Sequence, residues 1–137
     1  MSSKPDFRQA LSEVIKASWF SLEPGVYVYC RVQEVDHPEK HLMIVRDGQE
    51  ITVVTREENL SLLGSYEANN EKWRLLNIRC GNPFYCPGFI ATITTGMAEE
   101  GIDIVITSSF SNDLIMVMEK DLDQAVEILR NMGFEKK

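Results

Sequence analysis

The residues best suited to bind a small molecule are Pro87, Gly88 and Phe89, at the point where a predicted strand passes into a predicted helix. The first turn of a helix has amide groups without intrahelical partners, and the helix dipole adds positive potential there. Glycine allows close approach to the backbone, so the amides of Phe89 and Ile90 could hold an anion. The structural alternative is that Pro87 starts the helix and Gly88 accommodates packing.

A second polar group, Asp113, follows Ser111 and Asn112 in a predicted tight turn. These residue types commonly form turns by bonding to their own backbone, which is the structural interpretation. If a ligand with an ammonium group binds nearby, the carboxylate would supply its counter-charge. Both interpretations of Asp113 stay open at the level of the sequence.

Other polar residues do not favour catalysis. His37 and His41 lie in one polar loop, but Pro38 between them prevents the helical spacing that would bring both rings to a metal. The acidic pairs at 57–58 and 99–100 have the composition of solvated surface charge, and no phosphate-binding glycine loop or serine elbow is present. We therefore expect no catalytic residues, no metal and no cofactor.

Composition limits the class of protein. The 137 residues are 44% hydrophobic and 26% charged, which is typical of a globular protein, and the net charge of −7 is unfavourable for nucleic acid. The longest apolar run, 114–118, is too short to span a membrane, and residues 1–5 lack a signal-peptide core. Three cysteines, Cys30, Cys80 and Cys86, suit a reducing compartment. We expect a cytoplasmic protein without nucleic-acid or membrane partners, and the role of Cys86 stays open.

Periodicity predicts an irregular first half. Residues 6–17 have the apolar spacing of a one-sided helix, and 26–32 alternate as a half-buried strand. Two apolar runs, 42–46 and 50–55, flank Asp47-Gly48, a dipeptide typical of two-residue hairpin turns with positive φ. A short helix near 60–63 and a polar linker to residue 70 complete this half.

The second half is more regular. Its patterns predict a strand at 74–80, a helix from Phe89 to a stop at Gly101, and strands at 102–110 and 114–119. They also predict a helix from the N-cap Asp121 to Gly133. Gln124 would complete a capping box with Asp121, and 134–135 could add an edge strand. The order β-α-β-β-α predicts an α+β protein with a ferredoxin-like fold.

The second half also resembles a known family. The segments Cys86-Pro-Gly-Phe-Ile-Ala, Gly96-Met-Ala-Glu-Glu-Gly-Ile-Asp-Ile and Ser109-Phe-Ser-Asn-Asp-Leu-Ile-Met-Val, followed by 121–133, are similar to an ACT domain. With the segment Leu22-Glu-Pro-Gly-Val-Tyr-Val-Tyr-Cys, the chain resembles the small tandem-ACT proteins related to aspartate kinase regulatory domains and to amino-acid-sensing ACT proteins. The resemblance is stronger after Trp73 than before it.

The resemblance implies a βαββαβ module that binds a free amino acid between ACT units and does not catalyse a reaction. It implies that the ligand's carboxylate meets the first loop and helix start, and that Asp113 meets its amino group. The ligand-binding residues implied here are Asn82, Pro87, Gly88, Phe89, Ile90 and Asp113. The loop 82–87 is bulkier than in many members, so it would either cover a ligand or fill the pocket.

We therefore expect an N-terminal ACT-like unit over 1–70 and a C-terminal ACT domain over 71–137, side by side. The expected function is a homodimeric regulatory or sensor protein that binds a free amino acid or a similar small zwitterion. The alternative is a ligand-free ACT-like interaction module that dimerises or docks on a metabolic enzyme.

Overall fold

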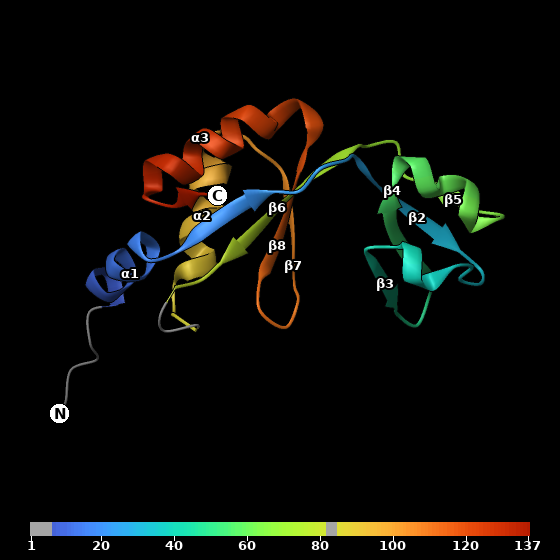
Figure 1. Cartoon of the computed structure of the whole chain (residues 1–137), viewed down its shortest axis with the longest axis horizontal. Coiled ribbons are helices and arrows are strands. Elements are labelled where there is room, and N and C mark those ends of the chain that lie inside the picture. The colour runs from blue at the N-terminus through green and yellow to red at the C-terminus, as the bar shows by residue number, and fades with distance from the viewer. Residues whose placement is uncertain (1–6, 82–84) are drawn as a thin grey trace.

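The computed structural model describes residues 7–81 and 85–137 (Figure 1). Three α-helices and three 3-10 helices lie among nine strands in these residues. The helices are α1 (Phe7–Lys16), α2 (Phe89–Glu99), α3 (Leu122–Met132), η1 (Pro38–Lys40), η2 (Glu57–Leu63) and η3 (Glu119–Asp121). The strands are β1 (Trp19–Leu22), β2 (Tyr27–Val32), β3 (Met43–Arg46), β4 (Ile51–Arg56), β5 (Glu67–Ala68), β6 (Trp73–Arg79), β7 (Ile104–Ser108), β8 (Asp113–Met118) and β9 (Glu135–Lys136).

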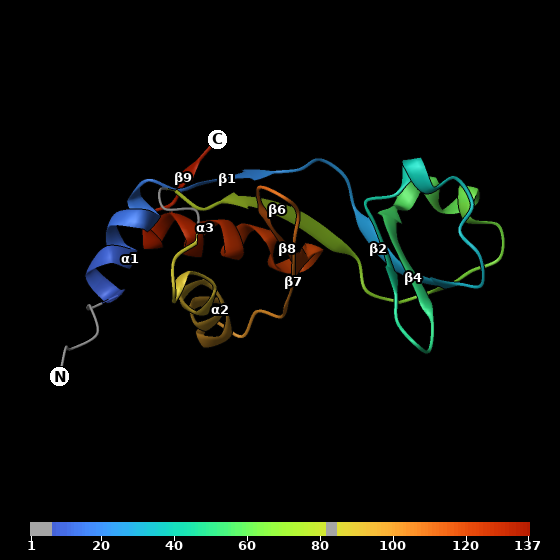
Figure 2. The same ribbon diagram turned by 90° about the horizontal axis from the view of Figure 1, so that it is seen from below.

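The molecule is elongated and has two lobes (Figures 1 and 2). The C-terminal lobe holds the three α-helices with β1, β6, β7, β8 and β9, and the N-terminal lobe holds β2 to β5. One strand pairing, Tyr27 with Trp73, joins β2 to β6 and links the strands of both lobes into one nine-stranded sheet. The two lobes therefore share a continuous backbone ladder.

The C-terminal lobe confirms the predicted α+β, ferredoxin-like fold. Its elements follow the order β6-α2-β7-β8-α3-β9, and α2 and α3 lie on the same side of the sheet. The strands lie in the order β7-β8-β6-β1-β9, with β6 antiparallel to β8 and β8 antiparallel to β7. The apolar residues on the helical side of the sheet form the main hydrophobic core of the molecule.

No pattern in the sequence predicted β1, which lies between β6 and β9. This four-residue strand is antiparallel to β6, from Trp19 opposite Arg79 to Leu22 opposite Leu76, and parallel to β9. A ferredoxin-like unit normally fills this place with its own last strand. Here β9 is at the edge, and the N-terminal segment supplies the neighbour of β6.

Residues 7–22 thus pack with the C-terminal lobe, on the far side of the boundary expected at residue 70. Phe20 is fully buried in the same core as Ile78 and Leu129, and Leu11 and Val14 of α1 also belong to it. Burial of apolar surface explains this position, because the apolar face of α1 packs against the C-terminal elements. The division of the chain into two ACT-like units stays a prediction.

The N-terminal lobe repeats the ferredoxin-like strand order in a reduced form. Its elements run β2-η1-β3-β4-η2-β5, and its strands pair in the order β5-β2-β4-β3. Two 3-10 helices of three and seven residues stand where a ferredoxin-like unit has α-helices. Because such short turns cover little of a sheet, this lobe has only a small core around Val28, Val53 and Leu63.

Two local predictions were wrong in detail. The hairpin of β3 and β4 exists, but Gly48 does not have a positive φ, and the Asp47 carboxylate accepts hydrogen bonds from the amides of Gln49 and Glu50 at 2.7 and 2.9 Å. A four-residue loop held by the Asp47 side chain replaces the expected two-residue turn. At the start of α3, Asp121 makes no capping hydrogen bond with its side chain, because η3 leads directly into the helix.

Of the helices in the described ranges, none combines the length and apolar character needed to cross a bilayer.

Candidate functional site

The predicted ligand-binding residues in the described part of the chain gather at one end of the C-terminal lobe. Asp113 begins β8 opposite Ile78, close to the end of β6, and α2 starts after the loop that follows β6. The start of α2 and the turn between β7 and β8 therefore lie at the same end of the sheet (Figure 1). Asn82 lies outside the described residues.

The start of α2 has backbone donors without an acceptor in residues 7–81 and 85–137. Gly88 takes φ 87° at the N-cap position, and no side chain caps the helix. The Phe89 amide donates to the Cys86 carbonyl at 3.1 Å, and the Thr92 amide donates to Gly88 at 2.9 Å. The two amides between them, of Ile90 and Ala91, have no acceptor among the residues that the structure describes. An anion in front of α2 would find two donors there.

Phe89 itself differs from the expectation. Its amide is already bonded, so the expectation of a free donor at this residue is wrong. Its side chain is buried and meets the ring of Phe134 edge to face, with centroids 5.6 Å apart. Phe89 anchors the helix start to the core, and a role in ligand contact stays a prediction for this residue, as it does for Pro87.

The turn at Asp113 has a specific structure. The Ser109 amide donates to the Asn112 carbonyl at 2.9 Å, and the Ser108 hydroxyl donates to Asp113 Oδ1 at 2.9 Å. These bonds confirm the tight turn and fix the carboxylate. The other oxygen, Oδ2, has no hydrogen-bond partner within the described ranges. The half-buried carboxylate could thus accept a bond from an ammonium group.

Cys80 shows that these groups lie close together. Burial, with smaller effects from the charges of Cys86 and Asp113, raises the pKa of the Cys80 thiol to about 11. Cys80 is buried, while Cys86 is half-buried just before α2. Cys86 and Asp113 therefore both lie close enough to Cys80, at the end of β6, for their charges to act on its thiol.

The end of α1 supports this part of the fold, a feature that sequence reasoning missed. Ser18 is almost fully buried, and its hydroxyl donates to the Val14 carbonyl at 2.6 Å and accepts the Gly81 amide at 2.7 Å. A Cβ on Gly81 would lie 2.8 Å from backbone atoms of Ala17. The chain therefore leaves β6 in close contact with α1, and a glycine at this position was the available signal.

Three large apolar side chains are exposed around this end of the lobe. Phe110, between β7 and β8, is 98% exposed, and Tyr85, in the loop before α2, is 85% exposed. Ile90, in the first turn of α2, is 36% exposed. Exposed apolar groups that lie together are common at surfaces that another molecule covers.

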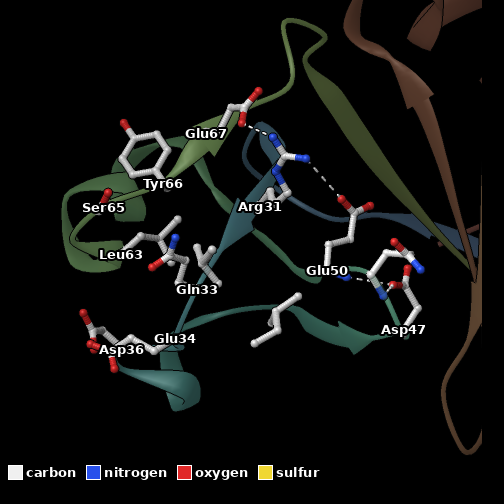
Figure 3. Close-up of a pocket in the computed structure, with 14 residues that line it drawn as sticks. Arg31, Gln33, Glu34, Asp36, Asp47, Glu50, Leu63, Ser65, Tyr66 and Glu67 are labelled. Carbon is white, nitrogen blue, oxygen red and sulfur yellow. Dashed lines mark hydrogen bonds and ion pairs between the residues drawn. The ribbon is translucent and has the colours of Figure 1, made fainter.

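A large, acidic hollow lies in the other lobe and has a different character. It has a volume of about 1110 Å³ and lies along the end of β2, the β3–β4 loop and the start of β5 (Figure 3). Arg31 crosses it and pairs with Glu67 and, at 3.6 Å, with Glu50. The hydrogen bond and charge of Glu67 raise the pKa of Arg31 most. The cationic group of this hollow is therefore already neutralised by carboxylates of the protein.

A metal centre has no support in the described residues. No group of three or more His, Cys, Asp or Glu side chains in residues 7–81 and 85–137 lies close enough to hold an ion. His37 and His41 each bond elsewhere, His37 to the Leu62 carbonyl at 3.1 Å and His41 to Thr55 and the Asp36 carbonyl.

Comparison with known proteins agrees with this fold. The ACT domain family matches residues 69–131. A Vibrio cholerae protein of unknown function, described as a possible transport protein, is similar over 93% of this chain and 99% of its own, with 20% identity and a TM-score of 0.80. An Agrobacterium tumefaciens protein is similar over 88% of this chain and 92% of its own, with 18% identity and a TM-score of 0.73.

The ligand-free regulatory subunit of aspartate kinase from Thermus thermophilus is similar over 85% of this chain and 96% of its own, with 13% identity and a TM-score of 0.60. No curated protein sequence matches the chain. ACT domains are regulatory and not catalytic modules. Residues 69–131 are therefore similar to an ACT domain, and the fold of the chain is similar to that of an aspartate kinase regulatory subunit.

Proposed function

We propose that this chain is a regulatory protein that binds a free amino acid, or a similar small zwitterion, and catalyses no reaction itself. The observation that supports this most is that the Ile90 and Ala91 amides and Asp113 Oδ2, at the same end of the lobe, have no hydrogen-bond partner among the described residues. A zwitterion needs one group of each kind.

In the proposed complex the ligand's carboxylate accepts hydrogen bonds from the Ile90 and Ala91 amides, where the dipole of α2 also favours negative charge. Gly88 has no side chain to obstruct this approach. The ligand's ammonium group donates to Asp113 Oδ2, a charge-assisted bond that is stronger than a neutral one. Every group in this arrangement binds charge, and none is placed to act as an acid, a base or a nucleophile.

The proposed partner in assembly is a second copy of the chain. Phe110, Tyr85 and Ile90 have exposed side chains on the segments that carry the proposed site, and a second ACT unit would cover them together with the ligand. Ligand binding would then change the stability of the homodimer or its contact with a regulated enzyme. A cytoplasmic location remains our expectation for such a protein.

A thermal-shift screen of the twenty amino acids tests the proposal, because a ligand that binds only the folded state raises its melting temperature. We expect at least one amino acid at millimolar concentration to raise Tm. The variant Asp113→Asn should lose most of that increase and keep its own basal Tm. Asp123→Asn, which changes an exposed carboxylate in the first turn of α3, is the matched control and should respond like the wild type.

Two results would contradict the proposal. If no amino acid changes Tm, the chain fits the alternative of a ligand-free interaction module. If Asp113→Asn and Asp123→Asn respond to the ligand equally, the amino acid binds elsewhere on the molecule.

A further inference from the structure

A small hollow in the N-terminal lobe has the opposite charge to the rest of the molecule. It has a volume of about 260 Å³ and is lined by Tyr27, Lys40, His41, Leu42, Arg56 and Asn59. The chain has a net charge of −7, yet two cations and no carboxylate line this hollow. The lining residues come from β2, η1 and the segment after it, the end of β4, and η2. Such convergence of donors from separate elements is typical of ligand sites.

Arg56 is the residue that the fold holds most firmly there. It faces Tyr27 across the β2–β4 ladder, its Nε donates to the Tyr27 hydroxyl at 3.3 Å, and its guanidinium carbon lies 5.8 Å from the centre of that ring. The Tyr27 side chain is buried, with 4% of its surface exposed. Gly25, at φ +100°, leaves room for the arginine stem, because a Cβ there would lie 3.2 Å from Arg56 Cδ and Nε.

The outer nitrogens of Arg56 are left for another partner. Glu58 and Glu23 lie near enough for their charges to raise the pKa of Arg56, behind the larger effect of the Tyr27 hydroxyl. Neither carboxylate forms an ion pair with Arg56 in the described structure. The two terminal amino groups of this held guanidinium have no partner among the described residues, and the edge that they form matches the geometry of a phosphate or carboxylate group.

The other residues that line the hollow add positive charge and no negative charge. Lys40 is exposed and forms no ion pair with a described residue, and the side-chain Nδ2 of Asn59 donates to the Lys40 carbonyl at 3.3 Å. The His41 ring is already bonded on both sides, since its Nε2 donates to the Asp36 carbonyl at 2.8 Å and its Nδ1 meets the Thr55 hydroxyl at 2.9 Å. His41 therefore forms part of the wall, and Arg56 and Lys40 supply the charge.

We propose that this hollow is a binding site for a small oxyanion, either inorganic phosphate or the carboxylate of a small metabolite. The site is separate from the amino-acid site of the C-terminal lobe and does not depend on it. Its volume is slightly below the range of drug-sized ligand pockets, so it suits one anionic group and little more. Gly25 and Tyr27 lie where β1 passes into β2, beside the Tyr27–Trp73 pairing, so a bound anion would restrain the junction between the lobes.

The test is an amide chemical-shift titration of the full chain with sodium phosphate and, in a second series, sodium succinate. Sodium chloride keeps the ionic strength constant, because exposed charges respond to any salt. We expect a saturable shift of the Gly25, Tyr27 and Asn59 amides with at least one of the two anions. Saturation with phosphate alone, or with succinate alone, identifies which source of oxyanion the site prefers.

Three variants assign the effect to the hollow. Arg56→Gln should weaken the affinity about tenfold or more, because a hydrogen bond to a charged group is lost from a held geometry. Lys40→Gln should weaken it by a smaller factor. Arg46→Gln removes the same charge from an exposed position on β3 of the same lobe and should bind like the wild type.

The proposal is overturned if the shifts do not saturate, if sodium chloride alone reproduces them, or if Arg46→Gln weakens binding as much as Arg56→Gln. If circular dichroism shows that Arg56→Gln does not fold, Lys40→Gln decides the question: weaker binding supports the site, and unchanged affinity overturns it.

Discussion

At Gly88 the whole proposed amino-acid site depends on one backbone conformation. With φ at 87°, the residue turns the chain into α2 so that the Ile90 and Ala91 amides face outward from the helix end. A residue with a Cβ is strained by about 1 kcal/mol or more in this region. The sequence indicated this position because Pro87 and Gly88 stand directly before an apolar helical pattern. It could not show that Cys86 accepts the Phe89 amide, since that bond depends on the path of the loop.

We expect Gly88→Ala to lower the free energy of unfolding by about 1 kcal/mol and also to weaken amino-acid binding. The matched control is Gly101→Ala, which has φ +72° and no atom within 4 Å of a new Cβ. Urea denaturation should show a similar loss of stability in both variants, whereas calorimetric titration should show weaker binding only in Gly88→Ala. Equal affinities in the two variants would remove Gly88 from the site.

The Cys80 thiol should make the stability of the folded protein depend on pH. Its folded-state pKa is raised to about 11 from an ordinary value of 9.0, so the folded protein holds this proton more tightly than the unfolded chain does. The resulting stability is fully present below about pH 9 and is lost as the pH rises toward 11. Urea midpoints measured from pH 7 to 10.5 should fall more steeply in the wild type than in Cys80→Ala. Parallel curves would show that this thiol does not contribute to the dependence.

At the scale of elements, the local patterns were sufficient for α1, α2, α3 and the β3–β4 hairpin, because each depends on contacts between near neighbours. The strand β1 was missed for the opposite reason. Its four residues have no alternation to recognise, and its partner Ile78 lies far along the chain from Phe20. Only the assembled core makes this segment a strand. The small strand β5 was missed in the same way, as it has two residues and pairs with β2.

The position of β1 predicts that the second half cannot fold by itself. A fragment of residues 71–137 would expose the edge of β6 that β1 covers and the core surface that meets Phe20 and α1. We expect its amide spectrum to lack the dispersion of a folded protein, and a peptide of residues 1–25 added in trans to restore it. A fragment that is folded without the peptide would show that β1 is dispensable.

At the scale of the whole molecule, the two lobes pack against each other in a second apolar cluster, on the sheet face away from α2 and α3. Tyr27 and Val54 of the N-terminal lobe meet Trp73, Leu75 and Met116 of the C-terminal lobe in it. No sequence pattern indicated this cluster, because its members come from strands of both lobes. The junction between the two lobes is therefore packed with apolar side chains.

Trp73 should therefore matter to the stability of both lobes. It is 7% exposed, meets the ring of Tyr29 with centroids 6.1 Å apart, and buries an Nε1 donor without a partner among the described residues. We expect Trp73→Ala to cost about 3–5 kcal/mol in urea denaturation. Trp73→Phe keeps most of the ring and removes the unpaired donor, so its cost should be about 1 kcal/mol or less. Equal losses would mean that the ring does not hold the lobes together.

The most direct measurement of the central claim is a residue-resolved amide titration of the full chain with the amino acid that most raises its Tm, or with each of the twenty if none does. We expect a saturable shift of the Ile90, Ala91 and Asp113 amides, with the N-terminal lobe largely unaffected. The claim would be contradicted if no amino acid at ~10 mM, a concentration that detects even millimolar affinity, shifts these amides, or if the shifts instead surround Arg31 in the acidic hollow.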